Sequence, residues 1–117
     1  MRTTSGRRRS WWGWGWEDEA TPADQLDALA PVIAERLGHP VERRDPARIQ
    51  DLDLPAPRLT PPAALADACS TDPYDRAGHV YGKSFRDVVR AFHGDVPDPP
   101  DVVARPRDEA GLVALLD

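Results

Sequence analysis

The densest cluster of chemically capable side chains in this sequence is the run His79–Asp87, H-V-Y-G-K-S-F-R-D. Its G-K-S tripeptide, at positions 82–84, invites comparison with the phosphate-binding P-loop. That loop has the pattern G-x-x-x-x-G-K-[ST], because its backbone N–H groups must wrap the phosphates. Here Ala77 stands at the position of the first glycine, and no hydrophobic strand precedes the run. We therefore exclude a nucleotide-hydrolysing P-loop.

A simpler anion site remains open in the same run. Lys83 and Arg86 flank Ser84, the predicted start of a helix, where free N–H groups and the helix dipole favour a phosphate or carboxylate. His79 and Tyr81 lie just before it and complete the candidate residues for binding an anion or bracing a pocket. The competing interpretation, which we favour, is that both cations pair with nearby acids on a solvated face.

Other catalytic and metal-binding patterns are not found in the sequence. The histidines, His39, His79 and His93, have no cysteine or carboxylate at ligand spacings such as H-E-x-x-H or C-x-x-C. No Ser-His-Asp grouping can be assigned from spacing, and we expect Cys69 to be a packed thiol. The prediction is that this chain holds no catalytic, cofactor-binding or metal-ligating residue.

The tryptophan run W-W-G-W-G-W, residues 11–16, contains all four tryptophans of the chain. An extended backbone would place Trp12, Trp14 and Trp16 on one face, with glycines between them. Because exposed tryptophans promote aggregation, we expect these three to dock into a groove. The arginines before the run leave a weaker alternative, contact with a membrane surface.

Helices and an extended connector are expected to position these two runs. The predicted helices span residues 21–37, with a kink or split at Pro31, residues 61–68, and residues 84–92; an extended connector covers 39–58. Caps and apolar positions define the first and last helices: Thr21, Leu26, Leu29, Ile33, Leu37 and Gly38, and then Ser84, Phe85, Val88, Val89, Phe92 and Gly94.

The end of the sequence predicts a strand at 101–105 that runs into a helix. A βα unit needs a second strand beside the first, and none is evident. The helix carries four apolar side chains whose burial is worth roughly 1.5–3 kcal/mol each, against a net stability of about 5–15 kcal/mol for a whole domain. We therefore expect the chain to be the leading part of a larger protein that covers Leu112, Val113, Leu115 and Leu116.

Composition narrows the classes of function. The first ten residues carry four arginines and no acid, so the remaining 107 have a net charge of −9, which argues against nucleic-acid binding. Cys69 is the one cysteine, which excludes an internal disulfide and fits a cytoplasmic location. The longest apolar stretch is far short of the roughly 20 residues of a membrane span, so no transmembrane segment is expected.

Three segments, in this order, resemble one family of flavoproteins. W-W-G-W-G-W is similar to the W-x-G-W-G opening of alkyldihydroxyacetonephosphate synthase-like proteins. Residues 76–90, R-A-G-H-V-Y-G-K-S-F-R-D-V-V-R, resemble the segment that precedes their flavin domain. Residues 99–116, P-P-D-V-V-A-R-P-R-D-E-A-G-L-V-A-L-L, are similar to the first strand and helix of a vanillyl-alcohol-oxidase-type FAD-binding domain.

This resemblance implies an α+β fragment, mostly short helices and extended connector, that ends in the first strand and helix of that FAD-binding domain. It divides the chain into an Arg/Trp-rich amino-terminal segment (1–20), a helical and extended lead-in (21–97) and an incomplete start of the FAD-binding domain (98–117). The implied activity is an FAD-dependent oxidoreduction, or the alkyl transfer of the ether-lipid relatives.

The family's Gly-rich diphosphate loop and its catalytic region would follow residue 117, so no family catalytic or cofactor residue can be placed on this chain. We expect the chain alone to be inactive and to bind no FAD, with the remainder of the flavin domain as its partner. The alternative is a small protein-interaction module that docks through its tryptophan run and terminal helix.

Overall fold

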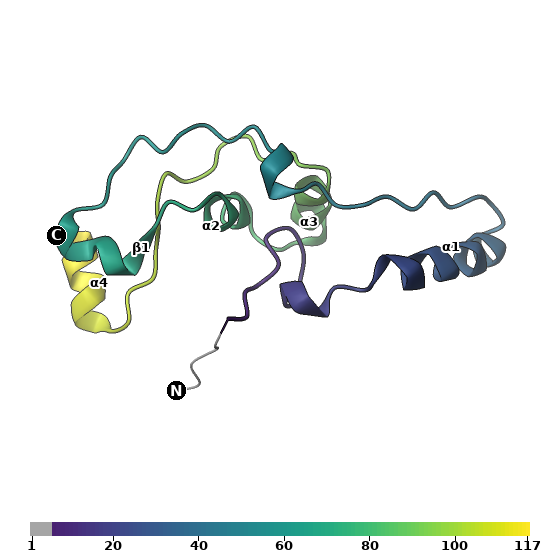
Figure 1. Cartoon of the computed structure of the whole chain (residues 1–117), viewed down its shortest axis with the longest axis horizontal. Helices are drawn as coiled ribbons and strands as arrows, with labels where there is room; N and C mark the ends of the chain where they lie inside the picture. Colours follow the sequence, from purple (N-terminus) through teal and green to yellow (C-terminus); the bar gives the residue numbers. More distant parts are fainter. Residues whose placement is uncertain (1–5) are drawn as a thin grey trace.

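Short helices joined by long extended connectors make up this molecule (Figure 1). The structure is a computed structural model that describes residues 6–117, so positions 1–5 of the Arg/Trp-rich segment lie outside the described residues. The α-helices and strands in chain order are α1 (Ala23–Leu37), β1 (Cys69–Ser70), α2 (Pro73–Gly78), α3 (Phe85–Phe92), β2 (Val103–Ala104) and α4 (Glu109–Leu116). Three 3₁₀ turns, at Glu17–Glu19, Ile49–Asp51 and Ala63–Ala68, complete the list. The expected short helix at 61–68 is the last of these turns.

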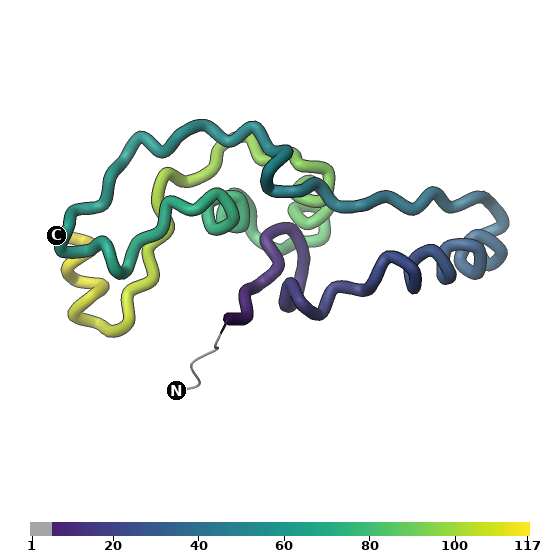
Figure 2. Tube along the Cα trace, in the orientation of Figure 1, coloured from purple at the N-terminus to yellow at the C-terminus, as the bar shows by residue number. Residues whose placement is uncertain are grey.

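The described chain is open rather than tightly packed. Its radius of gyration is 17.9 Å and its extents are 57 × 34 × 22 Å, whereas a compact domain of this length has a radius of about 13 Å. Figure 2 shows why, since α1 projects from one end of the molecule and α4 from the other. The core lies between these two ends of the molecule, around α2 and α3 (Figure 1).

Helix caps predicted from local chemistry are confirmed at α3. Ser84 Oγ accepts a hydrogen bond from the Asp87 N–H at 3.3 Å, and Gly94 after the helix has a φ of +77°. The buried side of α3 differs from the expected stripe, because Val88 and Ala91 are buried while Phe85 and Val89 are exposed. The helix therefore turns its Val88/Ala91 side inward.

Helix α1 is one helix that runs unbroken through Pro31, so the expected split into two helices is wrong. A proline inside a helix removes one N–H donor, and an exposed helix can leave the freed carbonyl to water. Gly38 ends α1 in the left-handed conformation, as predicted, whereas Thr21 does not cap it, because the helix begins one residue later with Pro22 as its flanking residue. No residue of α1 is buried.

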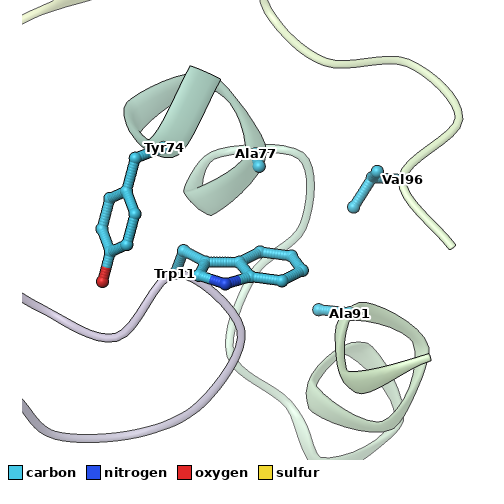
Figure 3. Packing of buried hydrophobic residues seen from close by; sticks show 5 residues of the cluster. All are labelled: Trp11, Tyr74, Ala77, Ala91 and Val96. Atoms are coloured by element: carbon cyan, nitrogen blue, oxygen red, sulfur yellow. The ribbon is translucent and has the colours of Figure 1, made fainter. Parts of the chain in front are cut away.

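The core forms around Trp11, which lies between α2 and α3 (Figure 3). Its indole is 7% exposed and is surrounded by Tyr74 and Ala77 of α2, Ala91 of α3 and Val96 of the following connector. The expected docked set was the other three tryptophans. Trp11 lies outside that set, yet it is the most buried of the four.

The tryptophan run is a tight turn, which corrects the expectation of an extended backbone. The Ser10 N–H donates to the Gly15 carbonyl at 3.0 Å, and Arg9 and Trp16 form an isolated antiparallel bridge. Gly15 has a φ of +79°, a conformation that side-chain-bearing residues rarely adopt. Because the backbone reverses here, the run is not a single extended strand.

The predicted carboxyl-terminal strand has a partner that the sequence analysis missed. β2 pairs antiparallel with β1, in the register Cys69↔Ala104 and Ser70↔Val103, and the Arg105 N–H donates to the Ala68 carbonyl at 2.7 Å. The described residues thus form an α+β chain with one two-stranded sheet. Helix α4 follows with no buried residue; Leu112, Val113 and Leu116 are exposed, as expected, and Leu115 is half-buried.

Candidate functional site

Lys83 fastens the tryptophan turn to the start of α3 in two ways. Its Nζ donates to the Trp11 carbonyl at 2.9 Å, and its own carbonyl accepts a hydrogen bond from Trp14 Nε1 at 2.7 Å. No acid pairs with this ammonium in the part of the chain that the structure describes. Burial alone lowers the pKa of Lys83. The expected pairing of this lysine with a local acid is therefore wrong.

The arginines before the turn lie against α2 and against the acids that follow the turn. The Arg8 guanidinium lies 3.5 Å from the ring centroid of Tyr74, and the Tyr74 hydroxyl donates to the Arg9 carbonyl at 2.6 Å. Burial is the main cause that raises the pKa of Tyr74. These contacts connect the amino-terminal segment to a helix more than 60 residues away.

Two of the three arginines at positions 7–9 are paired with acids. Arg7 binds Asp18 at 2.8 Å and Glu19 at 2.6 Å, and its hydrogen bond lowers the pKa of Asp18. Arg8 binds Glu17. Pairing of this kind reduces the positive charge available for an anionic membrane surface, so the structure gives no support to the membrane-contact alternative.

A cavity of about 580 Å³ opens between the arginine segment, α2 and the residue after β2. We call it the cationic cavity, because its lining includes five cationic side chains and a single carboxylate, namely Arg7, Arg8, Arg9, Lys83, Arg105 and Asp75. Trp11, Trp16 and Tyr74 contribute aromatic walls. Asp75 pairs with Arg105 at 2.9 Å; burial raises the pKa of Asp75, but the Arg105 and Ser70 hydrogen bonds outweigh burial and lower it.

The five predicted site residues separate in the structure. His79 and Lys83 both line the cationic cavity, and His79 Nδ1 is 2.7 Å from the Asp75 carbonyl. The Arg90 guanidinium lies 5.7 Å from the ring centroid of Tyr81. Ser84 caps α3. Arg86 is exposed and lies outside this cavity. The cations that accompany Lys83 come instead from the two ends of the chain.

A second cavity, of about 550 Å³, lies between the tryptophan turn, the start of α1 and α3. Its lining includes Trp12, Trp14 and Trp16, the three tryptophans that were predicted to dock. Apolar residues of the two helices also line it, namely Leu26, Val88 and Phe92. The rings of Trp12 and Phe92 meet edge to face with centroids 5.2 Å apart, and those of Trp14 and Phe85 stack with centroids 6.5 Å apart. Trp14 is nevertheless 61% exposed. The three residues thus line one depression.

Arg76 is the structural residue that sequence reasoning missed. It is 2% exposed, and its guanidinium donates to the Pro100 carbonyl at 2.8 Å and to the Pro55 carbonyl at 2.7 Å. Beside it, Arg58 pairs with Asp101 at 3.0 Å, and this hydrogen bond lowers the pKa of Asp101. The two arginines join the outward and returning connectors, whose backbone paths are drawn in Figure 2.

Within residues 6–117, no group of three or more histidine, cysteine or acidic side chains could hold a metal ion. Across the same residues, no helix is long and apolar enough to cross a membrane. The cationic cavity and the tryptophan-lined depression are therefore the features around which a function can be argued.

Comparison with solved structures assigns the fold. Alkyldihydroxyacetonephosphate synthase, in crystal form P1, matches 92% of this chain with a TM-score of 0.70 at 22% sequence identity. The same synthase in form P212121 matches 92% with a TM-score of 0.67 at 19% identity. The chain therefore has the fold of part of such a synthase, and it covers 25% and 24% of those two chains.

A sequence relative points to the same enzyme. The alkyldihydroxyacetonephosphate synthase of Trypanosoma brucei brucei is 33% identical over 51 residues, which are 44% of this chain and 8% of that protein. No protein-family model matches the sequence. The chain is thus similar to alkyldihydroxyacetonephosphate synthase in both sequence and fold, and it spans only a small part of that protein's length.

Proposed function

We propose that this chain is the amino-terminal part of an alkyldihydroxyacetonephosphate synthase-like, FAD-linked flavoprotein and that it turns over no substrate by itself. The lengths of the matched segments support this proposal. A solved synthase chain matches 92% of this chain, and the matched part is only 25% of the synthase chain. In this proposal residues 98–117 begin the flavin domain, and residues 1–20 and 21–97 brace it. Both oxidation and alkyl transfer stay open as the chemistry of the whole protein.

The exposed apolar surface of α4 supports the need for a further partner. Leu112, Val113 and Leu116 are 47%, 51% and 78% exposed. A helix that is apolar on all sides is normally buried, and covering each of these side chains is worth roughly 1.5–3 kcal/mol. The remainder of the flavin domain is the partner that we propose for this helix.

The described residues do not fit an FAD site of the glycine-rich type. Such a site needs several glycines in one loop, so that the backbone approaches the diphosphate at a helix N-terminus. The glycines with positive φ are instead isolated along the chain, at Gly6, Gly15, Gly38 and Gly94. In this proposal the loop that would hold the flavin lies in the remainder of the protein.

Reconstitution tests the proposal directly. The chain is co-expressed with a polypeptide covering the remaining three quarters of a synthase that resembles it, and flavin absorbance is read on the purified complex. We expect no flavin band for the chain alone, and a stable, yellow complex for the pair. A chain that binds FAD by itself would contradict the proposal.

Matched variants locate the contact. Leu112→Glu with Leu116→Glu changes only exposed side chains, so it should leave the chain's own unfolding unchanged and abolish complex formation. Leu59→Glu, at a connector residue that is 62% exposed, is the control and should leave the complex intact. If the chain is instead a cooperative monomer with protected amides in residues 102–116 and no affinity for the flavin part, the interaction-module alternative is favoured.

A further inference from the structure

The cationic cavity concentrates more positive charge than its neighbours neutralise. Arg7 and Arg8 are paired with the acids of residues 17–19, and Arg105 shares its charge with Asp75. Arg9 and Lys83 remain, and neither has a carboxylate partner among the residues that the structure describes. Both line the same cavity of about 580 Å³. Two unpaired cations at one cavity favour a ligand with negative charge.

The positions of Arg9 and Lys83 suit a charge-assisted contact. The Arg9 guanidinium lies 4.4 Å from the ring centroid of Trp16, which restricts where the cation can move. Lys83 uses one of its three N–H donors on the Trp11 carbonyl, so two donors remain. The lowered pKa of Lys83 agrees with a partly sheltered ammonium that an anion would stabilise.

We propose that the cationic cavity binds a small organic anion that carries at least two negative charges. Two charges match the two unpaired cations, and hydrogen bonds between ionised groups are the strong ones. Ligand cavities typically measure about 300–1,000 Å³, so the volume of about 580 Å³ leaves room for an organic body. The proposal uses only residues on this chain and does not depend on the flavin part.

Calorimetric titration of the 117-residue chain with phenyl phosphate and with phthalate tests this inference. The two probes share an aromatic body and a double negative charge, so they separate phosphate from carboxylate recognition. We expect saturable binding of at least one of them at low ionic strength, weakened by added salt because the charges are partly exposed. If neither binds with a Kd below about 1 mM, the inference is wrong.

Two variants tie binding to the cavity. Arg9→Gln removes a lining cation whose side chain makes no ion pair in the described structure, and it should weaken the Kd about tenfold or more. Arg86→Gln removes an exposed cation outside the cavity and should leave the Kd unchanged. Equal loss in the two variants would mean that binding follows net charge alone, and it would overturn the proposed site. An unchanged urea midpoint in both variants verifies that the core is intact.

Discussion

Replacing Trp11 by alanine tests whether this residue, rather than the alternating tryptophans after it, holds the molecule together. Trp11 is the largest side chain among the seven buried apolar residues of the described chain. It connects the amino-terminal segment, α2, α3 and the connector that holds Val96 (Figure 3). A cavity at this position would separate all four segments at once.

The size of the effect follows from the buried area. A tryptophan buries about 200 Å², and at about 25 cal/mol per Å² this burial contributes about 5 kcal/mol. Measured Trp→Ala changes in cores cost about 3–5 kcal/mol. Because a small domain has only about 5–15 kcal/mol of net stability, Trp11→Ala should remove a large share of it.

Urea unfolding followed by circular dichroism measures this loss, with Trp14→Ala as the matched control. Trp14 is 61% exposed and contributes one hydrogen bond to Lys83 and one ring stack, so its loss should cost about 1 kcal/mol. With a urea slope of about 1–3 kcal/mol per M, the Trp11 variant should shift the midpoint by about 2 M more than the control. Equal midpoints for the two variants would refute the assignment of Trp11 as the centre of the core.

Three further outcomes are expected. Ser84→Ala removes the cap of α3 and should lower the free energy of unfolding by about 1 kcal/mol; a urea midpoint equal to that of the parent chain would contradict the capping role. Arg76→Met breaks both connector hydrogen bonds and should speed exchange of the Arg58 N–H, which donates to Asp101, whereas unchanged exchange would show that the connectors hold without it. The Arg58 hydrogen bond lowers the pKa of Asp101 below its ordinary 3.8, so the stability from this pair is present above that value and is lost as the pH falls through the lowered pKa. Asp101→Asn should therefore flatten the acid side of a stability–pH profile, and an unchanged profile would argue against the pair.

Features set by neighbouring residues in the sequence were predictable. Ser84 caps α3 because its hydroxyl accepts a hydrogen bond from the free N–H three residues later. Gly38 ends α1 because a residue without a Cβ adopts the left-handed conformation easily. Both ends are therefore determined locally. The exposed apolar side chains of α4 were predicted for a similar reason, since counting leucines and valines near the end of the chain needs no knowledge of the fold.

Features set by distant residues were not predictable. The tryptophan run was interpreted with a period of two, which assumes an extended backbone, but the turn at Gly15 removes that assumption. Burial of Trp11 depends on α2 and α3, more than 60 residues away. Burial of Arg76 depends on two proline carbonyls that the outward and returning connectors bring to it. Lys83 meets the arginines of the cationic cavity for the same reason.

The two exposed helices differ in what they require of a partner. Helix α1 has apolar side chains toward one side, and Asp24, Asp27, Glu35 and Arg36 keep it hydrated elsewhere, so contact along a single face would satisfy it. Helix α4 has one acid, Glu109, in its first turn and only apolar residues and glycine after it. Such a helix gains from being covered on several sides, which a surface contact between two folded proteins rarely provides. Enclosure within a larger domain satisfies α4 better, and this difference favours the flavin-domain partner over the interaction module.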